Sequence, residues 1–169
     1  MIQYENKYNQ NDEMISEYVK KVLCKKTQRI GGLFSVFAFV MLIFTIWQKD
    51  NIMAAVFGTC LIIILLTLAI LSPSMKKGLK EANNRLHGGK QYETVVQFGD
   101  KITLSEGNVF IEVDYTQVQE IYDLKYSCVL KIGKNNSILL SPSGFTVGTY
   151  EDFQTFIREK CGPIKVYEK

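Results

Sequence analysis

Two long, uninterrupted apolar runs dominate the first half of this 169-residue chain. Residues Ile30–Trp47 and Ile52–Leu71 contain no Asp, Glu, Lys, Arg or His. As helices they would extend roughly 27 and 30 Å, about the thickness of a bilayer's hydrocarbon core. Only residues 48–51 separate the two runs, which is enough for a tight turn. The pattern therefore predicts a two-helix transmembrane hairpin.

The segment before the hairpin combines a strand pattern with a helix pattern. Ile2, Tyr4 and Tyr8 alternate with polar residues, which predicts a short strand that pairs with a sheet formed later in the chain. Asn11 is then placed to cap a helix through about Lys26, whose apolar residues recur at helical spacing. Two roles are open for this helix. It lies in the membrane interface with its lysines at the headgroups, or its apolar face packs on a soluble domain.

After the hairpin, helical periodicity gives way to strand periodicity. Ser72-Pro73-Ser74 predicts the end of the second span and the start of a basic connecting helix, which Gly88-Gly89 ends. About six short strands follow, separated by turns that contain glycine. A last helix has Thr149 at its N-cap and an apolar stripe that reaches Cys161. We expect a small curved antiparallel sheet, closed into a barrel that this helix plugs.

The predicted fold class is accordingly an α+β membrane protein. It joins the transmembrane hairpin to a small antiparallel barrel or sheet that is capped by a C-terminal helix. We divide the chain into residues 1–29 (strand and amphipathic helix), 30–71 (hairpin, with spans 30–47 and 52–71), 72–90 (basic connecting helix) and 91–169 (soluble domain).

Charge is distributed unevenly along the chain. Residues 1–90 carry 12 Lys and Arg against 6 Asp and Glu, a net charge of +6, whereas residues 91–169 carry 8 against 11, a net charge of −3. The positive excess flanks both spans, so the positive-inside rule predicts cytoplasmic termini and an external turn. The same cations are candidate contacts to the membrane surface and to anionic lipid, at about 1 kcal/mol each. They are Lys20, Lys21, Lys25, Lys26, Arg29, Lys76, Lys77, Lys80 and Arg85. Setting the topology would by itself explain them.

The order of these parts resembles the YcxB-like membrane proteins of bacteria. Three segments carry the resemblance: Phe98-Gly99-Asp100 before the Glu106-Gly107 turn, residues 113–118, and residues 140–145 before the final helix. The resemblance implies a multi-pass protein of the bacterial cell membrane. It also implies a C-terminal domain related to pleckstrin-homology folds, which are best known as modules that bind lipids or proteins. It implies no established activity.

The sequence offers little material for catalysis or metal binding. His87 is the only histidine, so common zinc sites and Ser-His-Asp triads lack their usual residues. The chain has no phosphate-binding loop, dinucleotide glycine fingerprint or nucleophile elbow. Glu112 and Asp114 share a strand face, where solvent-facing acids are the simpler interpretation. We therefore expect no enzyme, no catalytic residue, no cofactor and no metal, and the acidic second half disfavours nucleic acid.

The function predicted from these features is a non-enzymatic, membrane-anchored interaction or regulatory module that acts through its cytoplasmic domain. A protein partner or a second copy would then bind it. Small residues such as Gly31 and Gly58 begin the two spans, at opposite depths, so we expect them to face other helices or to reflect ordinary span composition. The alternatives are an anionic-lipid sensor, or an accessory subunit of a transporter or another membrane complex. Cys24 lies among lysines near the bilayer, where acylation is an alternative to an ordinary helix cysteine.

Overall fold

The computed structural model describes residues 2–90, 92–133 and 136–168. The chain divides into two compact units. We call residues 1–18 together with 82–169 the sheet unit, and residues 19–81 the hairpin unit. The hairpin unit is therefore an insertion, in sequence, between the first strand of the sheet unit and all the others.

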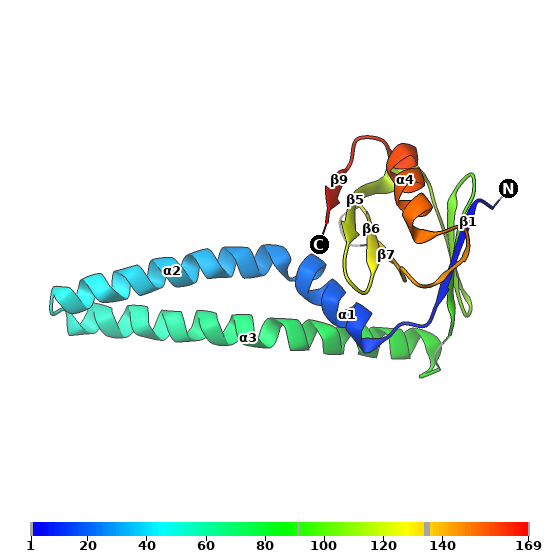
Figure 1. Cartoon of the computed structure of the whole chain (residues 1–169). Coiled ribbons are helices and arrows are strands. Elements are labelled where there is room, and N and C mark those ends of the chain that lie inside the picture. The colour runs from blue at the N-terminus through cyan, green and yellow to red at the C-terminus, as the bar shows by residue number, and fades with distance from the viewer. Residues whose placement is uncertain (1, 91, 134–135, 169) are drawn as a thin grey trace. The chain divides into compact units, whose positions relative to one another are not determined.

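Two long helices form the hairpin unit, α2 (Lys25–Trp47) and α3, which begins at Asn51. They run side by side in opposite directions (Figure 1). Lys49 in the turn has a φ of 59°, and the Asp50 side chain caps α3 by accepting the Met53 N–H at 3.1 Å. Both helices are long and apolar enough to cross a membrane, as the sequence predicts.

Small residues of α2 face larger residues of α3. A Cβ atom added to Gly31 would lie 2.6 Å from a terminal carbon of Leu68, and Ala38 is buried. Gln28 Nε2 donates to Ser72 Oγ at 3.1 Å, which fixes the same antiparallel register. Of the two alternatives for these small residues, contact with a further helix is excluded for Gly31, because α3 already occupies its face. Gly32, by contrast, has nothing within 4 Å of an added Cβ.

The second long helix continues past its predicted end. α3 (Asn51–His87) contains Pro73, so the predicted break at Ser72-Pro73-Ser74 is wrong. Proline removes one helical hydrogen bond, the one to the carbonyl of Ala69, and the good helix formers on both sides maintain the rest. The predicted glycine stop is confirmed. Gly88 and Gly89 have positive φ values of 61° and 79°, which only glycine adopts readily.

The helix expected from Asn11 to Lys26 is two helices joined by a π-helical turn. The Asn11 cap is confirmed, because its Oδ1 accepts the Met14 N–H at 2.8 Å. However, α1 (Asp12–Tyr18) is only two turns long, and the π-helical segment Val19–Leu23 follows it. The Cys24 N–H donates to the Val19 carbonyl at 2.8 Å, five residues back. The lysines at 25 and 26 therefore begin α2, instead of ending a separate helix.

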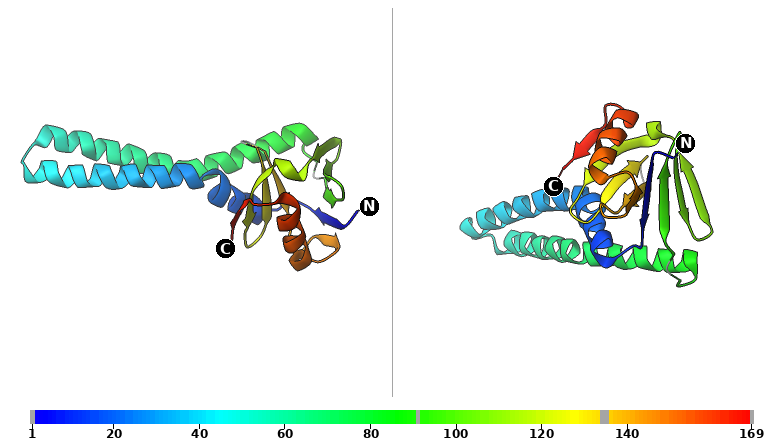
Figure 2. Two further views of the ribbon diagram at one scale, coloured as in Figure 1. Left: turned by 90° about the horizontal axis from the view of Figure 1, so that it is seen from above. Right: turned by 45° about the vertical axis from the view of Figure 1, so that its right-hand side comes forward.

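Nine strands make two sheets in the sheet unit, over the residues that the structure describes (Figure 2). The first sheet has the order β4-β3-β2-β1-β8 and the second β7-β6-β5-β9. The bounds are β1 Tyr4–Tyr8, β2 Thr94–Phe98, β3 Ile102–Glu106, β4 Val109–Val113, β5 Val118–Asp123, β6 Cys128–Ile132, β7 Asn136–Leu140, β8 Phe145–Val147 and β9 Lys165–Tyr167.

The expected closed barrel is wrong, because the strands form two separate sheets with their own edges. The second sheet is mixed, since β9 runs parallel to β5. The predicted pairing of the N-terminal strand is confirmed: β1 is antiparallel to β2 from Tyr4 opposite Phe98 to Tyr8 opposite Thr94. β8 and β9 have three residues each, too few to show a period, which is why the sequence pattern missed them.

One core lies among the two sheets and α4 (Tyr150–Cys161). The predicted N-cap is confirmed, because Thr149 Oγ1 accepts the Asp152 N–H at 3.2 Å. The predicted apolar stripe is confirmed too, with Phe153 and Ile157 fully buried. The Phe153 ring centroid lies 4.6 Å from that of Phe98, so α4 packs directly on the sheet that contains β1 and β2.

Candidate functional site

The hairpin unit exposes apolar side chains along its length. In the most apolar 18-residue stretch of α3, none of the residues is buried. In the corresponding stretch of α2, 11% are buried. Leu33 is 67% exposed, Ile52 78% and Trp47 80%. A core helix of a soluble protein would have one apolar face and that face would be covered. An apolar surface that extends around both helices is typical of contact with lipid.

Polar side chains inside the two spans are satisfied within their own helices. Each of the four hydroxyl groups between residues 30 and 71 bonds a backbone carbonyl three or four residues back, at 2.8–3.0 Å. The donors are Ser35, Thr45, Thr59 and Thr67. A hydroxyl with such a bond needs no water, so these residues are compatible with a hydrocarbon environment.

The predicted membrane-surface residues all lie on helical segments. Lys20 and Lys21 are in the π-helical turn, Lys25, Lys26 and Arg29 begin α2, and Lys76, Lys77, Lys80 and Arg85 lie in the last third of α3. The bond from Gln28 to Ser72 sets the start of α2 beside this part of α3. Eight of the nine cations therefore gather at the end of the hairpin unit that is opposite the turn, and Arg85 belongs to the sheet unit. We call those eight the basic end of the hairpin.

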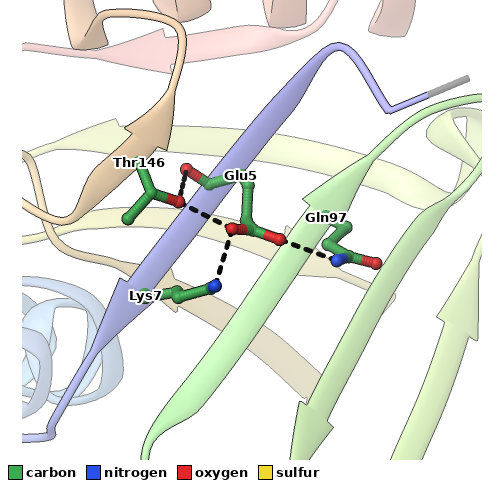
Figure 3. Close-up of polar contacts among 4 residues, drawn as sticks. All are labelled: Glu5, Lys7, Gln97 and Thr146. Carbon is green, nitrogen blue, oxygen red and sulfur yellow. Dashed lines mark hydrogen bonds and ion pairs between the residues drawn. The ribbon is translucent and has the colours of Figure 1, made fainter.

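Sequence reasoning missed a partly exposed polar network that joins β1 to its two neighbouring strands (Figure 3). The Glu5 carboxylate accepts hydrogen bonds from Gln97 Nε2 on β2 at 2.8 Å and from Thr146 Oγ1 on β8 at 2.7 Å. It also pairs with Lys7 Nζ at 2.9 Å. These contacts, led by the Gln97 bond, lower the pKa of Glu5 to about 2. Glu5 thus joins three strands that are far apart in sequence.

A buried side chain on β1 joins the first sheet to the chain after β7. Asn6 is fully buried, its Nδ2 donates to the Ser141 carbonyl at 2.7 Å, and its Oδ1 accepts the Ser141 N–H at 3.1 Å. The Tyr8 hydroxyl donates to the Leu139 carbonyl at 2.7 Å. β1 therefore bonds to both sheets, although the sequence pattern only predicts that it pairs with one.

A carboxylate also holds α1 in the sheet unit. Glu17 is 8% exposed and accepts the backbone N–H groups of Lys125 at 3.0 Å and Tyr126 at 2.8 Å, in the turn between β5 and β6. Met14 lies in the core beside the two sheets. Of the two roles left open for the N-terminal helix, packing on the soluble domain is therefore confirmed for α1.

Glu112 and Asp114, the two acids predicted to share a strand face, have structural partners. Glu112 pairs with Lys101, the residue before β3, at 2.6 Å, while the Asp114 backbone N–H donates to the Gln117 side chain at 3.2 Å. His87 is the last residue of α3. Over residues 2–90, 92–133 and 136–168, no group of three or more His, Cys, Asp and Glu could hold a metal ion.

The four cysteines are free thiols. Cys24 is only 2% exposed, which disfavours its acylation. Cys128 is also buried, and this burial raises the pKa of its thiol to about 12, so it is a poor nucleophile at neutral pH.

A scan against protein-family models, a search of curated proteins and a search of solved structures give no match to this chain. The resemblance to YcxB-like proteins therefore stays a prediction.

Proposed function

We propose that this chain is an integral protein of the bacterial cell membrane that holds its sheet unit at the cytoplasmic surface. The observation that carries the proposal is the exposed apolar surface of α2 and α3, in which the four hydroxyl groups between residues 30 and 71 bond backbone carbonyls of their own helices. Lipid is the medium in which such a surface costs no free energy, because the apolar side chains are then removed from water.

The pairing of β1 with β2 supports a topology with both termini on one side. β1 precedes the hairpin in sequence and β2 follows it, yet five consecutive residue pairs join the two strands. The chain must therefore cross the membrane an even number of times between them. The basic end of the hairpin then lies in the cytoplasm under the positive-inside rule, and Lys49 and Asp50 lie outside.

A topology experiment in whole cells tests this proposal. Cysteine would be placed at Asp50 in the turn and, separately, at the exposed Gln119 of β5, in a chain that carries Cys60→Ser. We expect an impermeant maleimide to label the first variant in intact cells, and the second only after the membrane is permeabilised. Labelling of both in intact cells, or release of the protein by carbonate washing, would refute the topology or the anchoring respectively.

Within this arrangement the sheet unit serves as a non-enzymatic interaction module with a pleckstrin-homology-like fold. Two sheets and a helix near the C-terminus that packs on their core support this fold assignment. Glu112 is paired with Lys101, and burial raises the pKa of the Cys128 thiol, as suits a stable scaffold. Purification of the full-length protein in mild detergent, followed by mass spectrometry, would show whether a protein partner or a larger complex is bound in fixed ratio.

A second candidate function is the recognition of anionic lipid, which the basic end of the hairpin favours. Each exposed cation near the headgroups contributes about 1 kcal/mol with anionic lipid. Native mass spectrometry of the full-length protein with added phosphatidylglycerol would measure this binding. Replacing Lys25, Lys26 and Arg29 with glutamine should weaken it by about 100-fold, whereas Lys49→Gln at the opposite end should not. Equal binding by both variants would contradict lipid recognition at this site.

A further inference from the structure

The outer edge of β4 is the least protected sheet edge in the described part of the chain. β8 and β9, which form two other edges, have three residues each. The fourth edge, β7, bonds to β1 through the Tyr8 hydroxyl and the Leu139 carbonyl. β4 is five residues long, pairs with β3 without a bulge and contains no lysine or proline. Natural proteins use short strands, bulges, lysine and proline to block such edges, so an edge that lacks all of them is suited to pairing.

Two residues of β4 direct their backbone groups toward this edge. The β3–β4 turn has two residues, Gly107 and Asn108, with a positive φ of 56° at Gly107, as in a type II′ hairpin. The pair that closes such a hairpin, Glu106 with Val109, exchanges hydrogen bonds, and the pattern alternates along the ladder. The N–H and C=O groups of Phe110 and Glu112 therefore point away from β3.

We propose that the β4 edge pairs with β4 of a second copy, antiparallel and with the two-fold axis at Ile111. In this register Ile111 lies opposite Ile111 and Val109 lies opposite Val113, so aliphatic side chains meet on one face. On the other face Phe110 lies opposite Glu112. Both outward-facing residues of each copy then exchange backbone hydrogen bonds, which joins two sheets into one.

Charge and exposure favour a second copy as the occupant. Glu112 is the only charged residue of β4, and it is already paired with Lys101 at 2.6 Å. In the proposed register no like charges lie directly opposite one another, and Asp114 lies opposite Asn108. Phe110 is 67% exposed and Ile111 45% exposed, so pairing would cover apolar surface that water now contacts.

This pairing rests on the proposed function, because a contact of this size needs both copies in one membrane to be well populated. One five-residue strand pair buries less than the roughly 1,000 Å² typical of a stable interface in solution. Confinement of both copies to one membrane raises their effective concentration and thereby favours a contact that would be weak in solution. The pairing should accordingly be populated in membranes and should fall when the protein is diluted in detergent.

Disulfide cross-linking in native membranes tests the register. In a chain that carries Cys60→Ser and Cys161→Ser, we would introduce Val109→Cys, Phe110→Cys or Ile111→Cys singly. Directly opposite residues that are not hydrogen-bonded have Cα atoms about 4.5 Å apart, within disulfide range. Ile111→Cys should therefore give a cross-linked dimer at least fivefold more readily than the other two. The matched control is Gln119→Cys, which is exposed on β5 in the other sheet.

The outcomes separate this inference from the proposed function. A maximum at Ile111 supports the pairing, and a maximum at another position, equal cross-linking at all positions, or none would overturn it. Ile111→Lys should abolish dimers detected in membranes with a chemical cross-linker that needs no introduced cysteine, while circular dichroism shows the native fold. Persistence of these dimers would also refute the pairing. Carbonate washing of the same membranes reports on anchoring alone, so a protein that washes off but cross-links at Ile111 contradicts only the proposed function.

Discussion

Replacing Glu5 with glutamine removes one negative charge and keeps the shape of the side chain that joins β1, β2 and β8. The pKa of Glu5 falls from 4.5 to about 2 in the folded chain, chiefly because Gln97, Lys7 and Thr146 bond its charged form. A shift of one unit corresponds to about 1.4 kcal/mol, so the full shift would give roughly 3.4 kcal/mol. The side chain keeps 14% exposure, and screening by solvent reduces the expected contribution to about 1–2 kcal/mol.

The sign of the pH dependence follows from the direction of this shift. A carboxyl group with a lowered folded-state pKa stabilises the fold above its unfolded pKa, and the contribution disappears as the pH falls through the folded value. Wild type should therefore exceed Glu5→Gln in stability by about 1–2 kcal/mol at pH 7. The difference should shrink between pH 4.5 and pH 2 and vanish below that window.

Urea unfolding of the full-length protein in a nonionic detergent, followed by pulse proteolysis of the sheet unit, would measure this difference. Hydrogen exchange of residues 4–8 provides a local readout, because β1 is the strand that Glu5 fastens. Thr146→Val removes one of the three donors and should produce a smaller loss with the same pH dependence. A Glu5→Gln effect that is equal at pH 7 and pH 2.5 would refute the electrostatic explanation and leave only a packing effect.

Three further predictions concern packing. Phe153→Ala should destabilise the sheet unit by about 3–5 kcal/mol, because the buried ring leaves a cavity; Phe153→Leu should cost less, and proteolysis at increasing urea would rank the two. Gly31→Val should destabilise the hairpin by about 1–3 kcal/mol through overpacking against Leu68, while Gly32→Val should not. Hydrogen exchange of α2 would compare the two variants, and equal effects would contradict the helix register. Deletion of residues 2–9 removes β1 and should make the remaining sheet unit sensitive to protease at neutral pH. Unchanged protease resistance would show that β1 contributes little to the stability of the sheet unit.

The sequence predicts the helices and most strands because their patterns are long. The two apolar runs and the alternation of β2 to β6 each extend over several residues, and periodicity identifies such segments well. The stop at Gly88 and the cap at Thr149 follow from local backbone chemistry, which neighbouring residues alone determine. These predictions hold because nothing distant in the chain competes with them.

Features that depend on distant contacts could not be predicted in the same way. The helix continues through Pro73 because its other backbone bonds outweigh the one that proline removes, although a local rule places a helix start there. β8 forms only because β1 offers it an edge, and Glu5 has a low pKa only because Gln97 and Thr146 are brought beside it. Gly31 faces α3 because the two helices adopt one register, which composition does not specify.

The position of β1 has a consequence for how the chain assembles. Tyr8 and Thr94 are neighbours in the sheet, but the whole hairpin lies between them in sequence. Closing a flexible loop of that length would cost conformational entropy before any strand pairing stabilised it. In the proposed topology two antiparallel spans return the chain to the side on which it began. β1 and β2 therefore lie at the same membrane surface. Formation of the hairpin would thus precede and promote completion of the sheet. The hairpin would then serve the fold of the sheet unit as well as its anchoring.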